Sequence, residues 1–405
     1  MLRLTIALGA ASCAAAAKND GFGPGAGAWE VATPESQGLS AALLEAADLA
    51  TESAMGGRVC NIVVKNGKIV HERYMGAGTE AGIRSAWSAT KSMCSSMFGI
   101  AVEQGWADVM DRVADRNAGT RLCNDEAEFR HVLTMTGTSP DIEAPRYSYD
   151  TLGTNCLDTL QDFISQNNPD GVDTVEWMQR YYFDKLGVEH SRWLPLAGDL
   201  LCGFSADTSC RDLARFGQLW ANEGVWPGDG GAPEQLMQRE FSVDGRTIEN
   251  LFPNAGRDYG YTLPLLSSDP VDNTAGSFVG MNAQCVVFSP EHNAVIVSMG
   301  NGGGCNTAWA NTRSAIVSDD HPIYNTTRDI PAPTFRQQAA AAKAEESRLK
   351  ADILELAPFM REHASRFTKE DLAQYSEKLV EYGEAPLDLA PSTPKGGRPV
   401  YTVQL

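Results

Sequence analysis

Residues 83–114 read IRSAWSATKSMCSSMFGIAVEQGWADVMDRVA. After Ser88 the apolar residues recur at helical spacing, which predicts a helix from Ser88 to about Gly105. Ser88 and Lys91 are three residues apart, so they would share one face of that helix and the lysine could reach the hydroxyl. Two interpretations follow. Ser88 either caps a helix on a polar surface, or it is a nucleophile with Lys91 as its base.

The setting of Ser88 favours the nucleophile. A helix N-terminus offers free backbone N–H groups and a dipole that stabilise a developing oxyanion. The flanking residues Trp87 and Met93 are apolar, and a lysine in such surroundings can serve as a general base. Two further Ser-x-x-Lys sequences lack this setting. Ser347–Lys350 lies on a highly charged helical segment, and Ser392–Lys395 contains a proline.

Strand patterns stand early and late in the chain, with helical patterns between them. Residues 60–75, CNIVVKNGKIVHERYM, alternate around Asn66-Gly67 and predict a β-hairpin. Residues 283–300 contain two strand-like runs joined by a turn, whereas residues 208–224 form an amphipathic helical pattern closed by glycine. The order predicts an α+β fold, an α/β sandwich, whose mainly antiparallel sheet is built from both ends of the chain and flanked by helices.

Composition and charge narrow the class of partner. The net charge is −19, from 33 basic and 52 acidic side chains, and such a surface would repel nucleic acid and anionic lipid. Leu4 to Ala17 is a short apolar run that ends in small residues, which is typical of a secretory signal peptide. No later stretch is long and apolar enough to span a membrane. We therefore expect a secreted or periplasmic protein with no nucleic-acid partner.

The cysteines agree with export. Cys13 would leave with the signal peptide, and an even number remains: Cys60, Cys94, Cys123, Cys156, Cys202, Cys210, Cys285 and Cys305. Eight cysteines in an exported chain predict disulfides, although about 105 pairings exist. A short-range pair between Cys202 and Cys210 is one prediction.

Other catalytic systems find little support. The sequence contains no Gly-x-Ser-x-Gly elbow, no His-Glu-x-x-His and no Cys-x-x-Cys. Its six histidines form no motif, and His131 is interpreted as structural. No cofactor and no metal are expected.

Several segments resemble one known family. Residues 83–114 are similar to the nucleophile helix of the serine β-lactamase-related superfamily, above all its class C β-lactamase, esterase and 6-aminohexanoate-oligomer hydrolase branch. RHVLTMTGTS (130–139), the segment 203–226 and the segment 277–301 resemble later family segments in the same order. The likeness covers about residues 35–315.

The residue patterns and the resemblance together predict a division of the chain into four parts. They are a signal peptide (1–17), a flexible lead-in (18–34), a β-lactamase-related catalytic domain (35–325), and a linker with a helical appendage (326–405). Within the catalytic domain, the sheet would come from about 35–87 and 256–325, and the inserted helical domain from about 106–255.

The resemblance also implies a tyrosine that relays protons between nucleophile and leaving group. Spacing favours Tyr149-Asp150-Thr151, in which Thr151 replaces the usual Asn or Ser and would contact substrate. Tyr147 is the alternative to Tyr149.

The family's third motif, Lys-Thr-Gly or His-x-Gly, corresponds here to Phe278-Val279-Gly280. Gly280 would permit close substrate approach, and the N–H groups of Met281 and Ser88 would form an oxyanion hole. Phe278 stands where the family has a cation that holds the β-lactam carboxylate, which argues against an efficient β-lactamase. Trp87 and Phe278 would either line an apolar substrate pocket or be core rings.

The resemblance therefore predicts a serine hydrolase that cleaves a small-molecule ester or amide. Ser88 would form the acyl-enzyme, with Lys91 and Tyr149 as general acid and base. The alternatives are a catalytically inactive member of the fold that serves in binding or assembly, and a peptidoglycan D-peptidase or β-lactamase with the same chemistry.

Overall fold

A computed structural model describes residues 21–116, 122–193, 200–246, 259–265, 274–300, 302, 305–316, 391–392 and 400–401. The predicted signal peptide lies outside these residues, as does the predicted appendage apart from the short strands β11 (Pro391–Ser392) and β12 (Val400–Tyr401). Among the described helices, none is long and apolar enough to cross a membrane.

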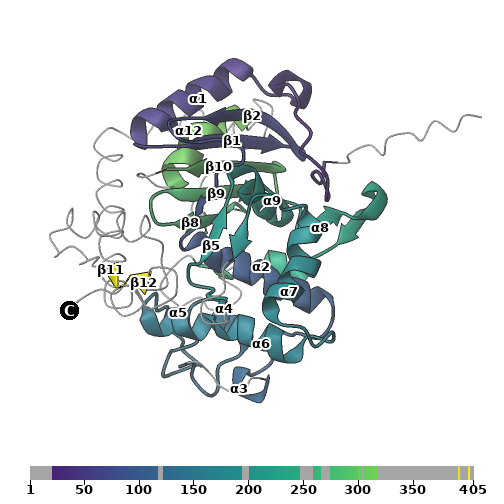
Figure 1. Cartoon of the computed structure of the whole chain (residues 1–405), viewed down its shortest axis with the longest axis vertical. Helices are drawn as coiled ribbons and strands as arrows, with labels where there is room; N and C mark the ends of the chain where they lie inside the picture. Colours follow the sequence, from purple (N-terminus) through teal and green to yellow (C-terminus); the bar gives the residue numbers. More distant parts are fainter. Residues whose placement is uncertain are drawn as a thin grey trace, which may run out of the picture.

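The main sheet has five antiparallel strands and joins both ends of the described chain (Figure 1). Its spatial order is β2-β1-β10-β9-β8, with bounds β1 Cys60–Lys65, β2 Lys68–Tyr74, β8 Gly276–Gly280, β9 Gln284–Ser289 and β10 Ala294–Met299. The pairing of β1 with β10 confirms the prediction that early and late strands share one sheet. Asn66 and Gly67 both take positive φ, as a tight hairpin turn requires.

Helices cover both faces of this sheet (Figure 1). The helices α1 (Ala41–Ala54) and α12 (Cys305–Ile316) pack together on one face. The other face carries α9 (Cys210–Ala221) and α2 (Ala89–Glu103). Alternate strand residues join two separate core clusters, Val63 and Ile296 with the α1 side, Ile62 and Val297 with the α2 side. The predicted antiparallel sheet flanked by helices is confirmed.

Apart from η1, the remaining described elements lie between β2 and β8. The helical ones are α3 Val113–Arg116, α4 Phe129–Leu133, α5 Thr151–Leu157, α6 Thr159–Asn167, α7 Thr174–Met178, η2 Gln179–Phe183, α8 Asp184–Leu186, η3 Asp229–Gly231 and α10 Arg239–Asp244, and η1 (Pro34–Gln37) precedes α1. The short strands are β3 Arg84–Ser85, β4 Arg192–Trp193, β5 Ala206–Thr208, β6 Val225–Pro227 and β7 Pro233–Gln235.

Helix α2 is central to the fold. Every residue from Ala89 to Ala101 is buried, so this helix is enclosed on all sides rather than on one stripe. Phe98 packs against Phe129 of α4 and Phe163 of α6, with ring centroids 4.8 and 5.5 Å apart. A helix held in this way presents its N-terminus from a rigid base.

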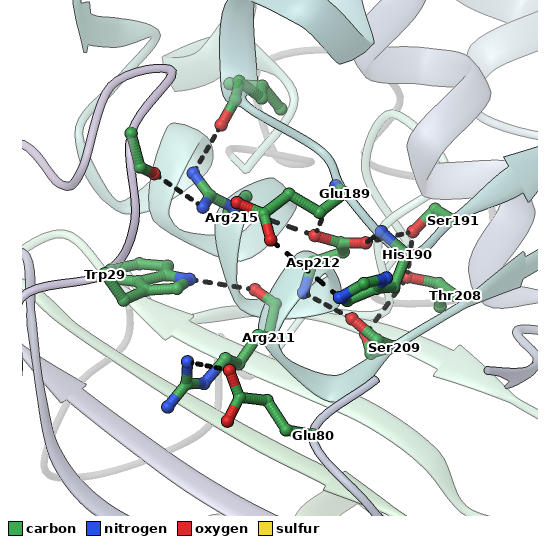
Figure 2. A network of polar contacts seen from close by, with 12 residues as sticks. Trp29, Glu80, Glu189, His190, Ser191, Thr208, Ser209, Arg211, Asp212 and Arg215 are labelled. Atoms are coloured by element: carbon green, nitrogen blue, oxygen red, sulfur yellow. Dashed lines mark hydrogen bonds and ion pairs between the residues drawn. The ribbon is translucent and has the colours of Figure 1, made fainter. Parts of the chain in front are cut away.

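The predicted lead-in contacts the rest of the described fold. From residue 21 onward it packs against α9, where the buried guanidinium of Arg215 donates to the carbonyls of Gly25 and Gly27 at 3.1 and 2.8 Å. Trp29 adds a hydrogen bond from its indole N–H to the Arg211 carbonyl at 3.1 Å (Figure 2). Buried arginines need acceptors, and the exposed backbone of a glycine-rich segment supplies them.

The disulfide pairing differs from the prediction. The four bonds are Cys60–Cys210, Cys94–Cys202, Cys123–Cys156 and Cys285–Cys305. The predicted bond between Cys202 and Cys210 is wrong, because Cys210 starts α9 and meets β1 whereas Cys202 meets α2. Nearness in sequence does not decide which partner a buried cysteine meets.

A buried charge cluster ties α1 to the first hairpin. Asp48 of α1 is fully buried, and its carboxylate pairs with Arg58 at 3.1 Å, with His71 at 3.2 Å, and with Arg73. Burial alone would raise the pKa of Asp48, but the hydrogen bonds from His71 and Arg73 and the charge of Arg58 outweigh it and lower the pKa to about 2.

This cluster predicts a specific pH dependence of stability. The folded-state pKa of Asp48 lies below its usual value of 3.8, so its contribution is full above that pH and is lost as the pH falls towards 2. We expect the difference in free energy of unfolding between wild type and Asp48→Asn to shrink by about 1 kcal/mol between pH 5 and pH 3. Urea denaturation at each pH measures it, and a difference that stays constant contradicts the assignment.

Candidate active site

Ser88 occupies the N-cap position of α2, yet its side chain makes no capping hydrogen bond. The backbone of Ser88 is already helical, with φ −65° and ψ −12°, so the hydroxyl points away from the free N–H groups of the first turn. It accepts instead from the Lys91 amine, with 3.0 Å between Nζ and Oγ. The capping interpretation of Ser88 therefore does not hold, and the two side chains meet as the spacing predicts.

The amine of Lys91 is buried in an arrangement of neutral groups. Lys91 is 2% exposed, and its Nζ also donates to the carbonyl of Gly203 at 2.8 Å. The ring of Tyr149 lies 4.6 Å from the same nitrogen. Within the described part of the chain no carboxylate pairs with Lys91, which is unusual because buried lysines normally have a counter-charge. Sequence reasoning missed Gly203, since a backbone acceptor carries no side-chain signal.

Tyr149 reaches Lys91 because the residues around it form a local cap. The Asp150 carboxylate accepts from the Gly153 N–H at 2.7 Å and so starts α5, and it accepts from the Ser148 hydroxyl at 2.6 Å. Tyr147 stacks on Tyr149 with centroids 6.3 Å apart. Of the two candidate tyrosines, Tyr149 is the one whose ring lies over the amine.

Thr151 is the first residue of α5. Its side chain lies outside what the structure describes, so its predicted substrate contact stays a prediction.

The residue before the nucleophile has an unusual backbone. Trp87 is 5% exposed and takes a positive φ of 47°, a conformation that costs about 1–3 kcal/mol for a bulky residue. The Ala86 N–H, bound to the Ala206 carbonyl at 2.8 Å, and the Trp87 N–H, bound to the Ser85 hydroxyl at 3.3 Å, hold the turn in place. This sharp turn joins β3 to α2 and sets the direction from which Ser88 enters the site.

Gly280 lets the end of β8 lie directly against this turn. A Cβ at Gly280 would stand 2.2 Å from the carbonyl oxygen of Ala86, so no larger residue fits without moving backbone. The contact sets the residue before Met281 against the turn that leads into Ser88. Among the described residues, neither the Ser88 N–H nor the Met281 N–H donates to an acceptor. An oxyanion hole formed by these two N–H groups stays a prediction.

Phe278 is a core ring, and Trp87 is a buried one. Phe278 is 0% exposed and meets Phe288 edge-on, with 5.9 Å between centroids, in the same core cluster that holds Trp193 and Trp220. Trp87 is 5% exposed and belongs to neither of the two core clusters. A direct substrate contact by either ring stays a prediction.

His131 and the cluster of Glu45, Asp48 and His71 take no part in the contacts around Ser88 and Lys91. His131 is buried in the capping box of α4, and burial, assisted by the charge of Arg130, lowers its pKa to about 4. Glu45, Asp48 and His71 stand close enough to hold a metal ion. However, the guanidinium groups of Arg58 and Arg73, which pair with the Asp48 carboxylate, would repel a metal ion.

Comparisons with known proteins support the fold that this geometry describes. No family model and no curated protein matches the chain. Solved structures do: a Bacillus anthracis protein provisionally named a 6-aminohexanoate-dimer hydrolase has 16% identity and a TM-score of 0.51, covering 64% of this chain and 78% of that one.

Two penicillin-binding protein homologues are similar in the same way. The octameric homologue from Pyrococcus abyssi has 15% identity and a TM-score of 0.51, covering 68% of this chain and 77% of that one. The homologue from Caulobacter crescentus has 12% identity and a TM-score of 0.52, covering 69% and 99%. The chain therefore has the serine β-lactamase-related fold.

The contact at Gly280 predicts a measurable cost of a single methyl group. Gly280→Ala should lower the free energy of unfolding by about 1 to 3 kcal/mol, because its Cβ would overlap the Ala86 carbonyl. Gly56→Ala is the matched control, since a Cβ there meets no atom within 4 Å. Urea denaturation compares the two variants, and equal stabilities would show that β8 does not press on the turn.

Proposed function

We propose that this chain is a serine hydrolase that cleaves an ester or amide through an acyl-enzyme on Ser88. The observation that carries the proposal is the 3.0 Å contact between the Lys91 amine and a Ser88 hydroxyl that does not cap its helix. The similar solved structures include proteins named as a hydrolase and as penicillin-binding protein homologues, and they support the fold in which such chemistry is placed.

Acylation uses the groups that converge on Ser88. The neutral amine of Lys91 takes the proton from Ser88 Oγ while that oxygen attacks the substrate carbonyl carbon. The carbonyl oxygen becomes an oxyanion that accepts from the N–H groups of Ser88 and Met281. Tyr149 gives its proton to the leaving oxygen or nitrogen as the bond to carbon breaks, and it recovers a proton from the Lys91 ammonium.

Deacylation runs the same transfers in reverse order. Water replaces the leaving group, and Tyr149 with Lys91 accepts its proton as the water oxygen attacks the ester carbon. The oxyanion again forms between the two N–H groups, and Ser88 leaves with a proton from Lys91. The carboxylic acid product departs and the site returns to its starting state.

The substrate we propose carries no obligatory carboxylate. Phe278 stands at the position where the resembling family places a cation, and its ring is fully buried. The chain as a whole has a net charge of −19, which would repel anionic substrates. Both features favour a neutral ester or amide over a β-lactam. Four disulfides are typical of an oxidising compartment, so we propose that the reaction takes place outside the cytoplasm.

Removal of either member of the pair should abolish hydrolysis. We expect Ser88→Ala and Lys91→Ala each to lower kcat/KM on short p-nitrophenyl esters by at least about 10³-fold, because the two residues act as one unit. Ser347→Ala, in a Ser-x-x-Lys sequence without the same setting, should leave the rate unchanged. A wild-type chain without esterase or amidase activity would instead favour a binding or assembly role for the fold.

The two tyrosines give a second test. Tyr149→Phe keeps the ring over Lys91 but removes the proton that reaches the leaving group, and should lower kcat by about 10²- to 10⁴-fold. Tyr147→Phe removes the hydroxyl of the ring stacked on it and should retain most of the activity. Steady-state kinetics on the same esters distinguish them, and the opposite order would assign the relay to Tyr147.

A further inference from the structure

The Lys91 amine has two acceptors, and the second of them is far away in the sequence. Its Nζ lies 3.0 Å from Ser88 Oγ and 2.8 Å from the carbonyl oxygen of Gly203. With one acceptor alone, the long lysine side chain could direct its amine away from Ser88 in another rotamer. The Gly203 carbonyl fixes the direction of the amine, so the placement of residue 203 sets the geometry of the pair.

The Cys94–Cys202 disulfide stands directly beside this contact. Cys94 follows Lys91 by three residues on α2 and therefore lies on the same helix face. Cys202 immediately precedes Gly203, and both sulfurs belong to residues that are 0% exposed. The bond thus links the helix that carries the donor to the segment that carries the acceptor.

Two further contacts hold the segment that contains Cys202 and Gly203. The Cys202 N–H donates to the buried Asp158 carboxylate at 2.7 Å. A Cβ at Gly203 would stand 2.4 Å from Cγ2 of Thr154, so the segment lies close against α5 as well as α2. With the disulfide on one side and α5 on the other, the Gly203 carbonyl has little room to move.

We propose that the Cys94–Cys202 disulfide and the Gly203 carbonyl are positioning elements for Lys91. This inference rests on the proposed function. The disulfide holds the carbonyl against the amine, the carbonyl directs the amine at Ser88, and loss of either slows acylation. The Cys60–Cys210 disulfide joins β1 to the start of α9 and contacts neither Lys91 nor Gly203, so its loss should affect stability without moving the amine.

The first test compares two disulfides. Cys94→Ala/Cys202→Ala should lower the rate of acylation by a p-nitrophenyl ester by about 10- to 100-fold, the effect of a small misplacement, and should displace the midpoint of its pH profile. Cys60→Ala/Cys210→Ala is the control. It opens a similar chain loop, with sequence separations of 150 and 108, so its loss of stability should be comparable. Its acylation rate and pH midpoint should match wild type.

The second test moves the carbonyl and leaves the disulfide intact. Gly203→Ala should slow acylation and displace the pH midpoint, because its Cβ overlaps the Thr154 methyl group. Adding Thr154→Ser removes that methyl group and should restore both quantities. Gly203→Ala, with and without Thr154→Ser, tests the positioning role even if Cys94→Ala/Cys202→Ala does not fold.

The possible results distinguish the positioning role from the proposed function. Wild-type acylation rates and pH midpoints in Gly203→Ala and in a folded Cys94→Ala/Cys202→Ala overturn the positioning role and leave the proposed function standing. A wild-type chain that no ester acylates overturns the proposed function itself. Slow acylation that follows stability alone, equally in both disulfide variants and with an unchanged pH midpoint, also contradicts the positioning role.

Discussion

A buried lysine amine that has no paired carboxylate among the described residues is the constraint on which this site depends. Lys91 is 2% exposed, and its contacts are a hydroxyl, a backbone carbonyl and an aromatic ring. These neutral partners come from three separate parts of the chain: the start of α2, the segment before β5, and the segment that leads into α5. The fold must bring all three together, because a buried amine without acceptors would be costly.

The surrounding structure explains how they are held. Helix α2 is enclosed by the sheet and by the aromatic residues of α4 and α6, so its N-terminus cannot shift freely. Gly280 lets β8 press against the turn that carries Trp87 in a strained conformation. The charged networks around Asp48 and Arg215 lie elsewhere, where they fasten α1 and the lead-in to the sheet and to α9. These charged groups are separate from the residues that contact Ser88 and Lys91.

The parts of the fold that local patterns determine were predictable from the sequence. Asn66-Gly67 between alternating apolar residues favours a hairpin, and a spacing of three residues places Ser88 and Lys91 on one face of a helix. What the sequence could not show depends on distant partners. The lead-in packs against α9 because Arg215 donates to its carbonyls, and Cys202 pairs with Cys94 because of how the segment before β5 meets α2.

The same reason limits what could be predicted of the site itself. The role of Gly203 is carried by a backbone oxygen, which has no residue type to recognise. From the sequence, Phe278 could equally line a substrate pocket or lie in the core. The structure shows that its ring is completely buried and packs against Phe288. In both cases the information lies in the packing of strands and loops that are far apart in the chain.

The central claim is that the Ser88 oxygen is the atom that bonds to substrate. Labelling the intact protein with a serine-reactive phosphonate, followed by peptide mass mapping, tests it most directly. If Ser88 is the nucleophile, the protein takes up one adduct per chain, located on Ser88 and absent from the Ser88→Ala variant. A protein that takes up no label, or takes it up on Ser347, would contradict the account.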